Sequence, residues 1–354
     1  MRPLRHHIPG ILGTALLTAF AGFWTFWSFS EFYYEGWGTP FPQPLAYLIP
    51  FAIALTLGAA TLAWPRVMGG AIIALSIAFY GWAMTMNLGR WGFSWGLVLS
   101  WSGIAALTLL GGMLFIVDGR VRARLGTDAA GSSAPWWRRR VRWLAVVGMP
   151  LAIALGISAV QLPQILLRQD DGNRGARVID GNGVRLVWAP AGPGWNWLQP
   201  WGGYPSWDSL AFYGVAPVGL KTARETGTRH HATAEDMART GLCGYLNAEG
   251  TTLMAEPQHI WRMPTADEFV RSLTRRGESA GCTWTGERGR MTCRRQPEKE
   301  TPLWNPDDQP IYMWTSEETT DRAWFVNYQA FVSSQPKGFG NPRHGYRCVK
   351  DPGR

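Results

Sequence analysis

The residue pattern with the most recognisable chemistry is GESAG at 277–281, which fits the G-x-S-x-G pattern of a serine nucleophile. Asp307 and His344 follow it in the order Ser, Asp, His. The pattern requires a strand that turns sharply into a helix, so that the Ser279 hydroxyl is exposed. Here the charged, helix-like segment DEFVRSLTRR precedes Ser279, and CTWTGERGR, which has no helical pattern, follows it. We therefore assign no catalytic residue.

Two histidines and four cysteines are the other candidates for site chemistry. His230 and His231, followed by Glu235, are metal-ligating residue types close together in the sequence. They come just before a helix start expected at Thr233, so we interpret them as solvated loop residues. The cysteines lack the C-x-x-C spacing of a zinc site. We predict no metal site from either group. The cysteines are Cys243, Cys282, Cys293 and Cys348.

An even number of cysteines favours disulfide bonds in an oxidising compartment. The sequence-local assignment joins Cys282 to Cys293 within one loop and leaves Cys243 for Cys348. In the loop-entropy model these bonds would stabilise the fold by about 3 and about 4.7 kcal/mol. The spacing alone leaves other pairings open.

The elements that must position these residues belong to two unlike halves of the 354-residue chain. Residues 1–167 hold five apolar stretches, each near the roughly 20 residues that a membrane crossing requires. The stretches are 8–29, 45–64, 69–88, 94–117 and 143–166. Ionisable residues are missing from the centre of each stretch, so we expect an all-α anchor in the lipid bilayer rather than a transport path.

Arginines set the expected orientation of this anchor. Arg2 and Arg5 precede the first stretch, and the connection 118–142 holds seven Arg and two Asp, whereas 30–44 holds two Glu and no Lys or Arg. Positive charge favours the cytoplasmic side. The N-terminus and 118–142 are therefore expected in the cytoplasm, and five crossings place residues 168–354 outside the cytoplasmic membrane. The first stretch lacks a small-residue cleavage site before Glu31, so we expect it to be retained.

The charge distribution argues against a nucleic-acid partner. Of the 34 Lys and Arg and 25 Asp and Glu, residues 1–167 hold 11 and 4, which leaves 23 and 21 for the remainder. The basic balance thus comes from the membrane half, where Arg sets topology. A nucleic-acid-binding domain would carry a basic stripe, and we predict no such partner.

The C-terminal half is an α+β domain by its local patterns. A polar linker, 168–182, leads to a strand within 183–192. Helices are expected at 233–250 and 263–277, each with a capping Thr at its start and a Gly at its end. The aromatic segment 195–214 and the region after 278 indicate irregular structure and short strands.

Five sequence elements of this half resemble motifs of the formylglycine-generating enzyme (sulfatase-modifying factor) family. They are VRLVWAPAGP, TAEDMARTGLCGYL, WRMPTADEF, IYMWTSEE and HGYRCV, in that order across about 183–351. The resemblance implies a C-type-lectin-like fold rich in irregular structure for residues 183–354. It also implies that Cys243 pairs with Cys348 and that Arg347 is buried against carbonyls or a carboxylate.

The departures from that family change the expected function. Copper-dependent members use a cysteine pair shortly before the terminal G-F-R-C, but no cysteine lies between Cys293 and Cys348. Ser333 and Ser334 cannot replace thiolate ligands for Cu(I). The family's calcium-binding Glu corresponds to Met313, which puts a calcium site in doubt. We predict no cofactor.

The resemblance places a candidate ligand groove at Trp314, Asn327, Tyr328, Ser333 and His344. Aromatic and amide groups suit a small polar ligand or a peptide. We therefore predict a membrane-anchored, extracytoplasmic binding or regulatory module. A divergent enzyme of the same family, acting on a peptide or a small metabolite, is the alternative. A structural partner of another envelope protein is the third hypothesis.

Overall fold

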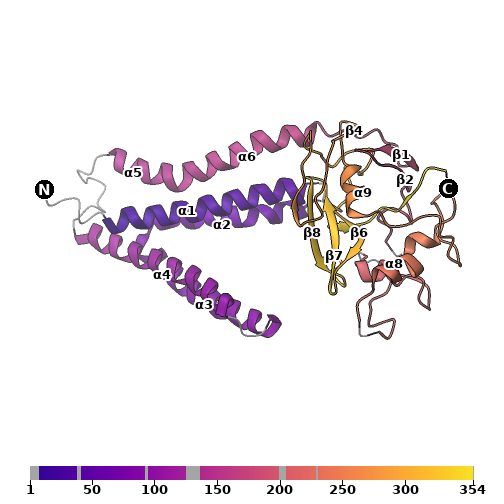
Figure 1. Cartoon of the computed structure of the whole chain (residues 1–354). Coiled ribbons are helices and arrows are strands. Elements are labelled where there is room, and N and C mark those ends of the chain that lie inside the picture. The colour runs from indigo at the N-terminus through magenta and orange to yellow at the C-terminus, as the bar shows by residue number, and fades with distance from the viewer. Residues whose placement is uncertain are drawn as a thin grey trace. The chain divides into compact units, whose positions relative to one another are not determined.

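The computed structural model describes residues 8–37, 41–91, 95–124, 136–198, 205–228 and 230–353. The chain divides into two compact units, Met1–Pro163 and Gln164–Arg354 (Figure 1). The first unit is helical, and the second contains strands, short helices and long loops.

Long helices make up the described part of the first unit. They are α1 (Ile8–Glu31), α2 (Ile49–Ala63), α3 (Pro65–Trp91), α4 (Trp95–Arg124), α5 (Trp136–Trp143) and α6 (Met149–Leu166). With their short 3₁₀ and π turns, they supply five segments long and apolar enough to span a membrane. Those segments are Ile8–Gly36, Gln43–Ala63, Pro65–Met86, Val98–Arg124 and Arg140–Leu166. The prediction of five long apolar helices is therefore confirmed, although helix extends from both sides into the connection that we expected at 118–142.

Small residues allow these helices to approach closely, as is common for helices in lipid. A Cβ placed on Gly69 of α3 would lie 2.7 Å from the carbonyl oxygen of Gly112 on α4, and one on Gly112 would lie 2.8 Å from that of Gly69. Asp118 near the end of α4 is buried and pairs with Arg122 at 2.5 Å and with Arg142 of α5 at 3.0 Å. This carboxylate therefore links α4 to α5.

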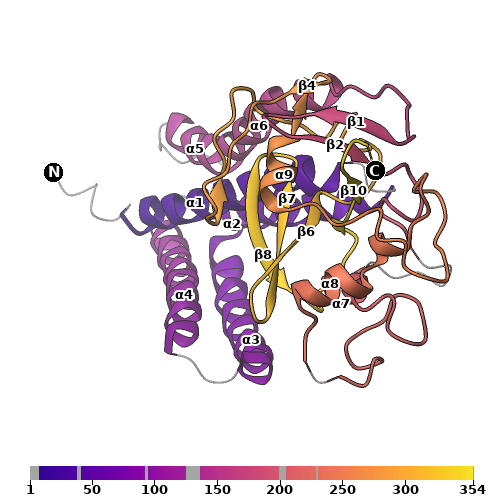
Figure 2. The same cartoon turned by 45° about the vertical axis from the view of Figure 1, so that its right-hand side comes forward.

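Three sheets organise the second unit (Figures 1 and 2). The largest has the order β5-β8-β7-β6-β9, antiparallel except for β9, which runs parallel to β6. Another places β10 beside β2, which also pairs with β1. The third is the short hairpin β3–β4. Their bounds are β1 (Arg177–Asp180), β2 (Arg185–Trp188), β3 (Thr274–Arg275), β4 (Glu278–Ser279), β5 (Gly289–Arg290), β6 (Tyr312–Glu318), β7 (Arg322–Asn327), β8 (Phe331–Pro336), β9 (His344–Gly345) and β10 (Val349–Lys350).

The short helices of this unit correct two predicted bounds and one predicted loop. Both expected capping boxes are present, at Thr233 before α8 (Ala234–Thr240) and at Thr265 before α9 (Ala266–Arg271). However, α8 ends ten residues earlier than predicted, because the backbone is extended at Gly241, whose ψ is 146°. Helix α9 ends before the β3–β4 hairpin, not at 277. Helix α7 (Trp207–Ala211) lies in the segment that we expected to be irregular; Ser206 caps it.

Large aromatic residues and two disulfides hold this unit together. Its core includes the buried rings of Trp207, Trp261 and Trp314. Cys243 is joined to Cys348, and Cys282 is joined to Cys293. These are the two pairs that the sequence analysis assigned. The first bond ties the turn after α8 to the residue before β10.

Candidate functional site

His344 in β9 is packed among aromatic rings at one end of the largest sheet. Its imidazole stacks on Trp314 with the ring centroids 4.6 Å apart. Tyr312 lies at 5.1 Å, and Phe325 and Phe339 each lie at 5.5 Å. Only 1% of His344 is exposed. This packing fixes the plane of the imidazole.

Hydrogen bonds also fix the tautomer of His344. Its Nδ1 lies 2.8 Å from Oδ1 of Asn341, and this oxygen also accepts the backbone N–H of Arg343 at 2.9 Å. An amide oxygen can only accept hydrogen bonds, so the ring must donate to it from Nδ1. In this tautomer Nδ1 carries the hydrogen and Nε2 has a lone pair. Nε2 is buried and has no hydrogen-bond partner in the described part of the chain. Burial lowers the pKa of His344 to about 4, so the ring is neutral at pH 7.

The same imidazole contributes to the wall of a cavity of about 330 Å³. This volume is at the lower end of the range of small-molecule sites, roughly 300–1,000 Å³. The remaining wall combines polar and apolar side chains from distant parts of the unit. The described lining residues are Arg174, Ala191, Trp195, Asn196, Leu198, Pro205, Asn305, Asp308, Gln309, Pro310 and His344.

Amide side chains hold the carboxylate of Asp308 in this wall. Asn305 donates from Nδ2 to one carboxylate oxygen at 2.8 Å, and Asn196 donates from Nδ2 to the other at 3.2 Å. Asn196 adopts a left-handed conformation with φ 54°, and its Oδ1 accepts the backbone N–H of Tyr346 at 3.0 Å. Since a carboxylate has about four acceptor positions, these two bonds leave Asp308 able to accept more hydrogen bonds.

Arg174 supplies the positive charge of the wall. It makes two parallel hydrogen bonds of 2.7 Å with Asp170 and a third, of 2.9 Å, with Oδ1 of Asn305. The hydrogen bond from Arg174 lowers the pKa of the Asp170 carboxyl, and the same contact raises the pKa of Arg174. The Arg174–Asp170 pair orients Asn305, and Asn305 in turn orients Asp308.

Trp195 connects this wall to a buried cation. The guanidinium of Arg347 lies 3.7 Å from the centroid of the Trp195 ring. Arg347 is fully buried and donates to the carbonyl oxygens of Ala189, Pro302 and Leu303 at 2.8–2.9 Å. Desolvation lowers the pKa of Arg347. The prediction that Arg347 is a structural residue buried against carbonyl oxygens is therefore confirmed.

The cavity wall contains hydrogen-bonding capacity that the protein does not use. The indole N–H of Trp195, like Nε2 of His344, is buried without a partner among the described residues. Such a group carries a penalty of about 1–3 kcal/mol. The residues of the wall thus include the carboxylate of Asp308 and two rings that each have a nitrogen without a partner. A small molecule with both donors and acceptors would complement these groups.

The five residues of the predicted groove lie close in the sheet but do not share this cavity. Register places Trp314 opposite Phe325, and Phe325 opposite Ser333, while Asn327 and His344 both pair with Tyr312. Trp314, Asn327, Tyr328 and Ser333 are all buried. The side chain of Asn327 accepts the backbone N–H groups of Gln329 and Phe331 and so holds the β7–β8 turn. Of the five, His344 alone lines the cavity among the residues described.

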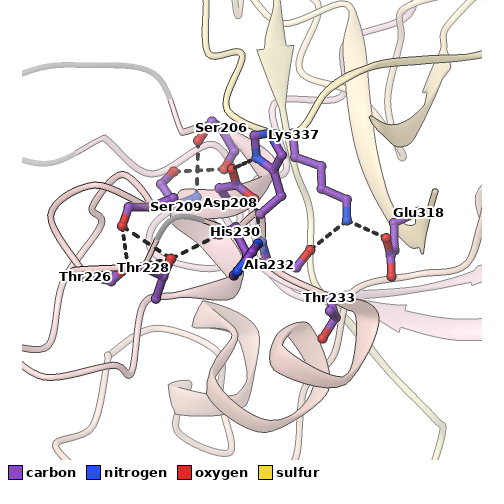
Figure 3. A network of polar contacts seen from close by, with 12 residues as sticks. Ser206, Asp208, Ser209, Thr226, Thr228, His230, Ala232, Thr233, Glu318 and Lys337 are labelled. Carbon is purple, nitrogen blue, oxygen red and sulfur yellow. Dashed lines mark hydrogen bonds and ion pairs between the residues drawn. The ribbon is translucent and has the colours of Figure 1, made fainter. Parts of the chain in front are cut away.

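A second polar network surrounds the two adjacent histidines (Figure 3). Nδ1 of His231 lies 2.7 Å from the buried carboxylate of Asp208, which also accepts the backbone N–H of Ala232 at 3.0 Å. Lys337 is buried; it bonds the carbonyl oxygen of Ala232 and the carboxylate of Glu318. The side chain of His231 is 44% exposed, so the loop is solvated only on one side.

The other motifs have structural positions. Ser279 lies in the β3–β4 hairpin, where its Oγ accepts the backbone N–H of Gly281, and not in a turn from strand to helix. Asp307 donates its backbone N–H to Asn305 within a turn. Among the described residues, no three His, Cys, Asp or Glu side chains are grouped so as to hold a metal ion.

A copper site of the family's type does not fit this chain. All four cysteines are in disulfides, so no thiolate is available for Cu(I). Ser333 is a buried residue of β8 and offers only a hydroxyl. Met313, which the resemblance would align with a calcium ligand, is buried in β6 and offers a thioether, which Ca²⁺ does not favour.

No protein-family model, curated protein or solved structure matches this chain at a significant level.

Proposed function

We propose that this chain is a membrane-anchored module that binds a small polar ligand in the cavity beside His344. The observation that carries the proposal is the neutral imidazole of His344, a residue of the cavity wall whose Nε2 is buried without a partner among the described residues. Buried polar groups normally have a partner, and an exception calls for an explanation. A ligand that donates to Nε2 and accepts from the Trp195 indole would remove both penalties.

The placement of this module follows from charge and disulfides. Arginines near the N-terminus and in 118–142 favour the cytoplasm for those segments, and the disulfides fit an oxidising compartment for the second unit. We propose an integral protein of the cytoplasmic membrane with residues 168–354 outside. A reporter enzyme that is active only outside, fused after residue 354, should be active; a silent fusion would contradict this orientation.

For the fold of the second unit we propose the formylglycine-generating-enzyme-like, C-type-lectin-like arrangement. The supporting features are the ordered sequence elements, the Cys243–Cys348 bond and the burial of Arg347. The chemistry differs, because the copper-binding cysteine pair is missing.

The ligand proposal is tested by blocking the cavity without disturbing the core. Leu198 lines the cavity and is exposed, so Leu198→Trp should fill it and leave the packing around Trp314 intact. Val218, also exposed but outside the lining, gives the control Val218→Trp. The purified full chain in detergent is screened by thermal unfolding against a panel of small polar metabolites. We expect at least one compound to stabilise the native protein and Val218→Trp, but not Leu198→Trp.

A panel without any stabilising compound, or stabilisation that survives in Leu198→Trp, would contradict the proposal. A second substitution, His344→Phe, keeps a ring on Trp314 and removes Nε2. It should weaken the response to a ligand that donates to this nitrogen.

A divergent enzyme is the alternative function, and the contact between His231 and Asp208 favours it. A buried carboxylate that fixes Nδ1 of a partly exposed histidine leaves Nε2 free to transfer a proton. Recovery of every compound of the panel after incubation with the chain separates the two functions. A binding module returns all of them unchanged, whereas an enzyme converts one of them to a product, and His231→Gln should slow this conversion while Leu198→Trp should not.

A further inference from the structure

A second pocket of the C-terminal unit lies next to the end of the last membrane helix. Its volume is about 530 Å³. Its described lining residues are Gln164, Arg275, Arg276, Glu278, Arg295, Gln296 and Glu298. Gln164 is in the last turn of α6, two residues before the end of the candidate span Arg140–Leu166. A residue at the end of a span lies at the depth of the lipid head groups.

Arginine dominates the charge of this pocket. Arg276 is exposed, and its side chain forms no ion pair with a carboxylate in the part of the chain that the structure describes. Arg275 reaches its nearest carboxylate, that of Glu300, only at 3.7 Å, and its Nη1 is buried without a hydrogen-bond partner among the described residues. Arg275 is therefore held only loosely by Glu300 and adds positive charge to the pocket wall, where Arg276 and Arg295 can donate to an anion such as phosphate.

The carboxylates of the pocket are already engaged. Glu298 is buried and accepts two hydrogen bonds from Arg168, at 2.8 and 3.2 Å. Glu278 pairs with Arg295, but both side chains are mostly exposed, 69% and 57% respectively. An exposed ion pair is worth about 0–1 kcal/mol. An anion can therefore take Arg295 from Glu278 at small cost.

We propose that this pocket binds the phosphate of an anionic phospholipid at the end of α6. Free phosphate shares the chemistry, but the position of Gln164 favours a group that the bilayer itself presents. Basic residues at the membrane surface attract anionic lipids by about 1 kcal/mol each. The site is independent of the His344 cavity and of the side of the membrane on which the unit lies.

Exposed residues give variants that should fold. Arg276→Gln and Arg295→Gln should each weaken the binding of phosphatidylglycerol about fivefold. Glu278→Gln should tighten it, because it frees Arg295 from its partner. Arg239→Gln, on the exposed surface of α8, is the charge-matched control and should have no effect. Opposite signs at Glu278 and Arg295 would distinguish anion binding from a structural role of their ion pair.

The measurement is native mass spectrometry of the purified full chain in neutral detergent, titrated with phosphatidylglycerol or phosphatidylcholine. We expect excess occupancy by phosphatidylglycerol, and its loss in the Arg276→Gln, Arg295→Gln double variant. An excess that survives in the double variant would come from other arginines, such as those of 118–142, and would overturn the proposal. Equal occupancy by the two lipids, or a Glu278→Gln variant that binds more weakly, would also overturn it. Displacement of the lipid by inorganic phosphate at similar concentrations would indicate a soluble-phosphate site instead.

Discussion

In the helical unit buried hydroxyl groups bond carbonyls of their own helix, whereas in the C-terminal unit buried cations bond carbonyls of distant loops. Thr14 donates to Gly10 and Thr61 to Leu57, each four residues back. Arg347, by contrast, bonds carbonyls at residues 189, 302 and 303. Lys337 bonds the carbonyl oxygens of Ala232 and Thr320 in the same way.

The difference follows from where the backbone hydrogen bonds are made. A helix satisfies its own backbone, which is why helices suit a bilayer without water. A unit with short strands and long loops leaves buried carbonyls outside any ladder, and these need other donors. Long cationic side chains supply such donors here. The stability of the helical unit thus depends on close packing of its helices. The stability of the C-terminal unit depends on a few buried side chains and on its disulfides.

Among the substitutions that test this contrast, we expect loss of the disulfides to lower the free energy of unfolding most. Replacing Cys243 and Cys348 by Ala opens a connection of 105 residues and should cost about 4.7 kcal/mol, whereas replacing Cys282 and Cys293, 11 residues apart, should cost about 3 kcal/mol. Proteolysis of the C-terminal unit in increasing urea would measure both. Equal costs would show that loop length does not set the contribution.

The next effect is the loss of a buried cation. Arg347→Met keeps much of the volume but removes the donors of three buried carbonyls, so we expect a loss of roughly 3 kcal/mol or more. The same proteolysis assay measures it, with Arg239→Gln on the exposed surface as the control. A variant as stable as the native chain would mean that the carbonyls find other partners.

In the helical unit the sensitive positions are small residues. Gly112→Leu forces α3 and α4 apart, since its Cβ would already lie 2.8 Å from the Gly69 carbonyl oxygen, and overpacking of this kind costs about 1–3 kcal/mol. Its neighbour Gly111 has open space, so Gly111→Leu is a matched control. Thermal loss of helical circular dichroism in detergent separates the two. The disulfide-dependent protease resistance of the C-terminal unit should not change in either variant.

Near neutral pH the smallest effect is the pH dependence at His344. Its pKa in the folded chain is lowered to about 4 by burial. Between pH 6.5 and 4 the unfolded chain binds a proton at this residue and the folded chain does not, so His344 makes stability fall as the pH is lowered through this window. His344→Phe should flatten the pH dependence of the unfolding midpoint between pH 4 and 6.5. An unchanged slope would mean that other groups cause it.

Sequence patterns predicted the local features of this molecule. Apolar length predicted the five membrane segments, and Thr233 and Thr265 predicted the helix starts, because capping depends on residues three positions apart. The end of α8 was missed, since Gly241 continues in an extended conformation that no neighbouring residue signals.

The cavity could not be predicted from the sequence, for a different reason. Arg174, Asn196 and Asp308 come from three loops and were not singled out, because loop conformation here depends on contacts across more than 100 residues. Asn tolerates the left-handed conformation that Asn196 adopts, but its presence in the sequence does not predict that conformation. The sequence singled out His344 for its residue type, but it gave no sign of the residues that join it in the cavity wall. The other members of the predicted groove are buried in the sheet or next to it.

The pairing of β2 with β10 and the Cys243–Cys348 bond also constrain biosynthesis. Both join an earlier part of the unit to its last residues, so the disulfide cannot form until Cys348 has left the ribosome, nor the full pairing until Lys350 has. Cys282 and Cys293 emerge before Cys348. If oxidation followed the order of synthesis, Cys243 would meet Cys282 first. The native pairing therefore requires that Cys243 stay reduced until translation reaches Cys348, or that a disulfide isomerase correct the early bond.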